Sequence, residues 1–187
     1  MKYYVDIKAF SMDLQEIGEH PVMSELFQQV HSGIGQHENG DVAVSFPFYD
    51  GRKKSLGGTI RLHGSKEALE HTLSLVNLNT YALVGQVSSI PEEYSAVIVK
   101  RVRYVDNAQL RRLQKRAEQR GEIRELGELT KPLPEAPRLC VKTSSGRIIK
   151  HFLIKQEKAK LDQIPKEFGK EDFSLYGLSS QNAVPFF

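Results

Sequence analysis

The sequence predicts an α+β protein in two parts. Residues 1–92 are predicted to form a ferredoxin-like domain, because hydrophobic periodicity there gives strand, helix, two strands, helix and strand in that order. Pro91 interrupts this pattern. Residues 93–187 are predicted to form a smaller α/β domain, in which a strand leads directly into an arginine-rich helix at about 106–120.

Alternating apolar residues and turn signals define the elements of the first domain. Pro21 suits the first turn of a helix that should end near Gly33 or Gly35, and Ser65 suits the N-cap of a second helix. The predicted strands cover Tyr3–Phe10, Val42–Phe46, Thr59–His63 and Tyr81–Ile90.

The second domain has weaker periodicity. A Val- and Ile-rich strand over Tyr94–Tyr104 precedes the basic helix, for which Asp106 is a candidate N-cap and Gly121 follows the end. Prolines indicate a loop over 122–137, and two strands are predicted over Leu139–Thr143 and Ile148–Lys155. Residues 156–170 should form a short surface helix or a loop, and the apolar tail should dock in a core.

Cysteine and histidine placement argues against metal, disulfide and nucleotide-hydrolase chemistry. Cys140 is the single cysteine, so no intramolecular disulfide can form, which favours a reducing, cytoplasmic setting. None of the six histidines pairs with another at helical metal-site spacing, and no GxxxxGK loop is present. No apolar run is long enough to span a bilayer. We therefore expect no metal, no cofactor and no membrane contact.

Positive charge is concentrated in one segment. The chain has a net charge of +3, but residues 94–124 hold nine basic and three acidic residues, a balance of +6, which leaves −3 for the rest. The basic residues of the helix are Arg111, Arg112, Lys115, Arg116 and Arg120. Like charges at i, i+4 repel, so an unbalanced row indicates a polyanion such as RNA, whose backbone phosphates an arginine helix can follow.

Arg101 and Arg103 lie at alternate positions of the preceding strand and so point the same way. Each could donate two hydrogen bonds to a guanine. His31 lies on the edge of the first helix's apolar stripe, where its imidazole is either a half-buried structural group or a proton-transfer residue.

Several of these residues together resemble a known family. They are His31 after Met23-Ser24-Glu25-Leu26-Phe27, the segment Val44-Ser45-Phe46-Pro47, the arginine helix, Tyr176-Gly177-Leu178-Ser179 and Val184-Pro185-Phe186-Phe187. The chain resembles, over essentially its whole length, the CRISPR-associated repeat-processing endoribonucleases of type I-F systems.

The resemblance implies a function and a set of site residues. Family members cut precursor CRISPR RNA at the base of a repeat hairpin without a metal ion. They leave a 2′,3′-cyclic phosphate and a 5′-hydroxyl and stay bound to the crRNA product. Because the product is retained, the resemblance also implies partners among the other subunits of a surveillance complex. By resemblance, His31 transfers a proton, Tyr176 orients it, Ser145 or else Ser144 holds the attacking ribose, and Phe152 stacks on the terminal base pair of the stem.

The chain departs from the family pattern at two places. The serine loop is shorter or shifted, which leaves both serines as candidates and keeps open a non-catalytic RNA-hairpin-binding subunit as the alternative function. Where the pattern has Arg-Val-Gln, the chain has Arg101-Val102-Arg103. Glutamine suits adenine and arginine suits guanine, so Arg103 should face a different base or a phosphate.

Overall fold

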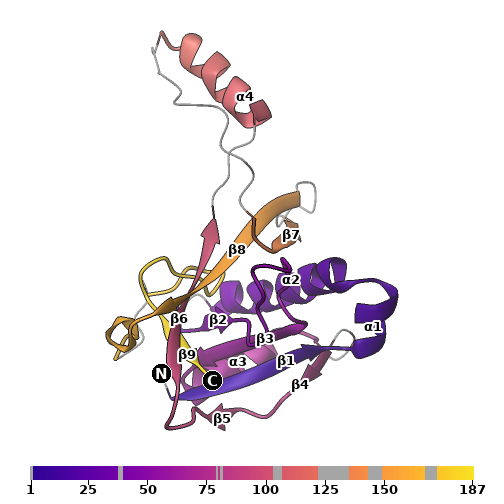
Figure 1. Ribbon diagram of the computed structural model, residues 1–187, viewed down its shortest axis with the longest axis vertical. Helices are drawn as coiled ribbons and strands as arrows, with labels where there is room; N and C mark the ends of the chain where they lie inside the picture. Colours follow the sequence, from indigo (N-terminus) through magenta and orange to yellow (C-terminus); the bar gives the residue numbers. More distant parts are fainter. Residues whose placement is uncertain are drawn as a thin grey trace.

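The computed structural model describes residues 2–37, 40–78, 80, 82–102, 107–121, 135–142, 149–166 and 172–187. Over these residues the protein is built from two antiparallel sheets and four α-helices, which confirms the α+β class (Figure 1). None of the described helices is both long and apolar enough to cross a membrane.

The first sheet is formed by the N-terminal half of the chain. Its strands pair in the order β2-β3-β1-β4, with β5 also paired to β1. The elements in chain order are β1 (Tyr3–Ala9), α1 (Ser11–Glu16), α2 (Glu19–His37), β2 (Ala43–Ser45), β3 (Thr59–Gly64), α3 (Lys66–Ser74), β4 (Ala82–Val84) and β5 (Ser88–Ser89). The side chains of α2 and α3 join the strands' apolar residues in the core.

The second sheet has the order β7-β8-β6-β9. Its elements, with the helices between them, are β6 (Ser95–Val102), α4 (Asn107–Glu118), β7 (Arg138–Lys142), β8 (Ile149–Ala159), the 3-10 turn η1 (Leu161–Gln163) and β9 (Val184–Phe186). Figure 1 shows α4 standing apart from both sheets.

Some predicted elements have different bounds in the structure. The Ser65 hydroxyl accepts a hydrogen bond from the Ala68 N–H, so the predicted N-cap is confirmed. The strand predicted over Tyr81–Ile90 is two short strands, whose registers against β1 differ by one residue: Ile7↔Val84 in the first and Tyr4↔Ser88 in the second. Residues 156–159, predicted as helix or loop, extend β8, since they pair with β6 up to Ala96↔Ala159. The short helix α1 was not predicted.

One hydrophobic core joins the two sheets. It contains Ile7 and Leu62 of the first sheet, Leu139 and Phe152 of the second, and Phe27 of α2, all fully buried. Residue 92 lies between the last strand of the first sheet and the first strand of the second, and the division into two domains stays a prediction. The tail docks as expected, because Ala183 and Val184 are buried and Val184–Phe186 pairs with β6.

Arg61 ties the end of the chain to the first sheet. Its Nε and Nη2 donate to the Asp6 carboxylate at 2.6 and 2.9 Å, and its Nη1 donates to the Phe187 carbonyl at 2.9 Å. The guanidinium lies over the rings of Tyr4 and Phe187, at 4.7 and 4.0 Å from their centroids. The buried charge of Arg61 is therefore paired and hydrogen-bonded, as burial requires.

His63 makes stability depend on pH. Burial, with help from the charge of Arg61, lowers the pKa of His63 from 6.5 to about 3. The unfolded chain then binds a proton below pH 6.5 that the folded chain does not, so stability falls as pH falls towards 3, by about 1.4 kcal/mol per unit.

Urea unfolding of wild type and His63→Gln at pH 7, 6 and 5 tests this. The wild type should lose about 1 kcal/mol more stability per pH unit than the variant between pH 6 and 5. His151→Gln, which removes an exposed histidine, controls for the loss of an imidazole. Equal slopes for wild type and His63→Gln would contradict the assignment.

Candidate functional site

His31 is held in a defined tautomer. The helix α2 brings its half-buried ring against the C-terminal segment, where the Nδ1 atom lies 2.9 Å from the carbonyl oxygen of Leu175. A carbonyl can only accept, so Nδ1 carries the hydrogen. In the neutral ring the lone pair then belongs to Nε2, which makes that atom a proton acceptor.

Tyr176 covers one face of His31. The two rings stack with centroids 3.8 Å apart and an interplanar angle of 19°. Burial lowers the pKa of His31 from 6.5, and the hydrogen bond to Leu175 opposes that shift only in part. The ring is therefore mainly neutral at pH 7, the form needed to accept a proton.

The stack continues from Tyr176 to the second sheet. The rings of Tyr176 and Phe152 are nearly perpendicular, with centroids 4.9 Å apart and an interplanar angle of 77°. The guanidinium of Arg101 lies 3.8 Å from the centroid of the Phe152 ring. Phe152 is fully buried, whereas Arg101 is exposed. Stacking of Phe152 on a base pair stays a prediction, and it would require Arg101 to leave the ring.

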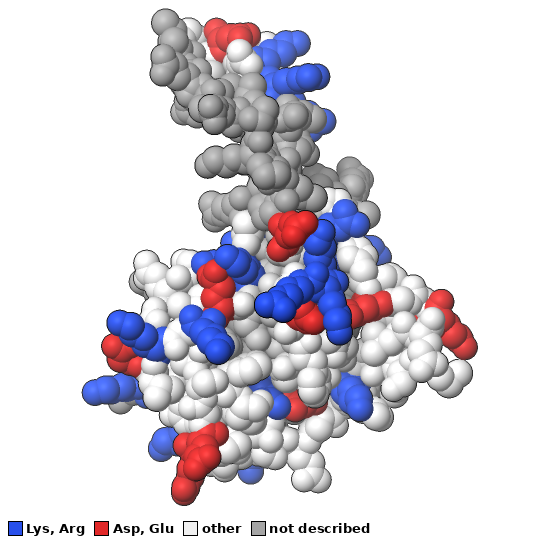
Figure 2. Space-filling model, in the orientation of Figure 1, with Lys and Arg blue, Asp and Glu red and all other residues white. Residues whose placement is uncertain are grey.

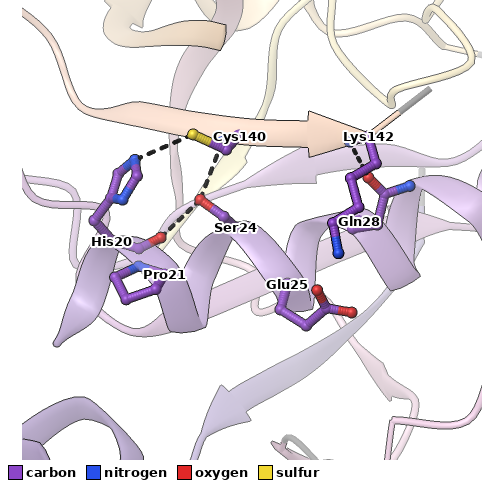
Figure 3. A pocket seen from close by; sticks show the side chains of 7 residues that line it. All are labelled: His20, Pro21, Ser24, Glu25, Gln28, Cys140 and Lys142. Carbon is purple, nitrogen blue, oxygen red and sulfur yellow. Dashed lines mark hydrogen bonds between the residues drawn. The ribbon is translucent and has the colours of Figure 1, made fainter. Parts of the chain in front are cut away.

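Helix α2 runs along β7, the strand at one edge of the second sheet. The Cys140 N–H donates to the Ser24 hydroxyl at 3.0 Å, and the Lys142 N–H donates to the Gln28 side-chain oxygen at 2.6 Å (Figure 3). Helix and strand thus run in the same direction, towards His31 on α2. Ser144, Ser145 and Arg103 lie outside the described residues.

The predicted basic helix is present and exposed. The four basic side chains of α4 are exposed to solvent, namely Arg111, Arg112, Lys115 and Arg116. Arg120 is also exposed but lies in the turn after the helix, which ends at Glu118 and not at the predicted residue 120. Figure 2 shows basic side chains on this helix and others on the body of the molecule below it. On the apolar side of α4, which was expected to pack against the rest of the protein, Ala117 is buried but Leu113 is 44% exposed.

Among the described residues, no three or more His, Cys, Asp or Glu side chains lie together so that they could hold a metal ion. Of the site residues predicted from the sequence, the structure brings together His31, Tyr176, Phe152 and Arg101. Sequence reasoning missed the Leu175 carbonyl, because a backbone acceptor leaves no residue-type signal.

The cover that Tyr176 provides can be measured. Replacing Tyr176 with Ala should raise the pKa of His31 towards 6.5, because water then reaches the ring. Tyr176→Phe keeps an aromatic ring over His31 and should leave the pKa close to the wild-type value. NMR titration of the His31 ring in all three proteins is the measurement, and an unchanged pKa in Tyr176→Ala would contradict the role of the stack.

Comparison with known proteins identifies the family. Residues 4–187 match the family described as CRISPR-associated protein (Cas_Csy4). Two curated relatives carry the name CRISPR-associated endonuclease Cas6/Csy4. One, from Escherichia coli (strain UTI89 / UPEC), is 29% identical over 197 residues, and one from Pseudomonas aeruginosa (strain UCBPP-PA14) is 28% identical over 200. Both alignments cover the whole of each chain. With the match covering nearly its entire length, this chain belongs to the Csy4 family of CRISPR-associated proteins.

Proposed function

We propose that this protein is a metal-independent endoribonuclease that cuts precursor CRISPR RNA at the base of the repeat hairpin. One observation carries the proposal: the His31 ring is fixed with Nδ1 donating to a carbonyl, which leaves Nε2 as a base. Both relatives carry the name CRISPR-associated endonuclease, which supports a nuclease function.

His31 acts as the general base in the proposed reaction. Its Nε2 takes the proton of the RNA 2′-hydroxyl, whose oxygen attacks the adjacent phosphorus. The bond from phosphorus to the 5′-oxygen breaks, and that oxygen leaves as a 5′-hydroxyl after gaining a proton from water. The other product carries a 2′,3′-cyclic phosphate. Alignment supplies several kcal/mol, and base catalysis contributes about 10²- to 10⁴-fold.

The other site residues hold the reacting groups in place. Tyr176 fixes the orientation of His31 through the stack. Ser145, or else Ser144, holds the attacking ribose; the described part of β7 ends at Lys142 beside Gln28, one helical turn before His31. The serines follow within three residues of that point in the sequence.

The hairpin is gripped by basic side chains. Arg101 binds a guanine edge near the base of the stem, and Arg103 binds another base or a phosphate. The four basic residues of α4, with Arg120 just beyond its end, follow the backbone. The product stays bound, and the crRNA then links the protein to other subunits of a cytoplasmic surveillance complex.

We also propose that the first sheet and its helices form a ferredoxin-like domain. The order of elements and the strand order β2-β3-β1-β4 support it.

Cleavage of a repeat hairpin tests the function directly. The wild type should cut the RNA in excess chelator, and His31→Ala should lose about 10²- to 10⁴-fold in rate while it still binds. A 2′-deoxy substitution at the scissile nucleotide should block the cut. Tight binding without any cleavage would instead indicate a non-catalytic RNA-binding subunit, and cleavage lost on chelation would contradict metal independence.

The pH dependence of kcat/KM tests the role of His31 as base. Because the pKa of His31 lies below 6.5, log kcat/KM should rise with pH in the acidic range and be level between about pH 7 and 8. In Tyr176→Ala the midpoint should move upwards. A rate that falls as pH rises through this range would show that His31 acts as an acid.

A further inference from the structure

The groove between α2 and β7 is a cavity outside the stack of rings around His31. Its volume is about 270 Å³, and it is lined by His20, Ser24, Glu25 and Gln28 of α2 with Cys140 and Lys142 of β7. Figure 3 shows His20 at one end and Lys142 at the other. We call it the α2–β7 groove.

The α2–β7 groove leads towards His31. Residues 20, 24, 28 and 31 follow at intervals of four, four and three, so they share one face of α2. His20 and His31 are eleven residues apart, which corresponds to about 16 Å along the helix axis. An extended strand of a few nucleotides covers that length.

The second sheet separates the groove from Arg101. Side chains alternate between the faces of a sheet, and paired residues share a face. Phe152 and its partner Leu139 are fully buried on the core face, where Arg101 covers Phe152. The next pair, Cys140 and His151, lies on the opposite face. A rigid stem bound at Arg101 therefore does not reach the groove, whereas a flexible single strand can.

The charges around the groove suit a phosphodiester. The Arg138 Nε donates to His20 Nε2 at 3.4 Å, and His151 Nδ1 lies 3.3 Å from the Cys140 sulfur. No carboxylate within the described residues forms an ion pair with Arg138 or Lys142. Glu25 is the one acidic residue among those lining the cavity.

The pKa of His20 agrees with this excess of positive charge around the groove. Burial lowers the pKa of His20 most, and the nearby Arg138 and His151 lower it further because their positive charges oppose another. A bound phosphate would oppose this shift and raise the pKa of His20.

We propose that the α2–β7 groove binds the single-stranded RNA that follows the scissile phosphate, through contacts of its phosphates with Lys142 and Arg138. The inference rests on the proposed function, because it takes His31 as the point where the strand is cut. The groove then holds the segment that leaves with the 5′-hydroxyl, and it gives the enzyme a preference for precursor over RNA that already ends at the cut.

Binding of uncleavable hairpins tests the groove. The probes are repeat hairpins with a 2′-deoxy scissile nucleotide and either one or six nucleotides beyond it. The longer RNA should bind the wild type about fivefold more tightly, the effect of one or two exposed charge contacts. Lys142→Ala should reduce this advantage to less than about twofold, and Glu25→Gln should increase it.

Two controls separate the possible results. Lys158→Ala removes an exposed lysine near the far end of β8 and should keep the full advantage. A hairpin extended by six nucleotides on its 5′ side should gain nothing. An advantage that persists in Lys142→Ala, or one that arises only from the 5′ extension, would overturn the groove assignment. If both hairpins bind equally well, only this inference fails; if neither binds, the proposed function fails with it.

Discussion

The edge of β7 is completed by a helix instead of another strand, and the rest of the site depends on that contact. Two α2 side chains, Ser24 and Gln28, accept the N–H groups of Cys140 and Lys142. An edge strand presents unpaired N–H groups, which proteins must cover or expose to water. Here the cover fixes the second sheet against the helix that carries His31. The histidine therefore has a defined position relative to β7 and β8.

The stack of rings around His31 depends on this fixed position of α2 against the second sheet. His31 comes from α2, Phe152 from β8 and Arg101 from β6, and Tyr176 connects them from the C-terminal segment. Each ring is packed by its neighbour, so the site is assembled from elements that also build the core. A packed core is stiff because its side chains interdigitate closely. A histidine held by this core keeps one orientation, which the proposed proton transfer requires.

The sequence was sufficient for the elements whose signals are local. Periodicity predicted α2, and the serine before Lys66 predicted its cap. It was not sufficient where pairing with a strand distant in the sequence decides the conformation. Residues 156–159 look polar and lysine-rich, yet they are a strand because β6 pairs with them. In the site, residue types singled out His31 and Arg101, and the family resemblance singled out Tyr176. Neither the Leu175 carbonyl nor the burial of Phe152 could be predicted, because both depend on contacts distant in sequence.

The contact between His31 and Leu175 joins residues 144 positions apart. The same C-terminal segment supplies β9, and its last residue is held by Arg61 of β3. Helix α2 can form early during synthesis, since its hydrogen bonds are local. Its histidine has no carbonyl to fix the tautomer and no tyrosine to cover it until residues 172–187 have been added. Under the proposed function, an unfinished chain therefore does not present the assembled His31 site to RNA.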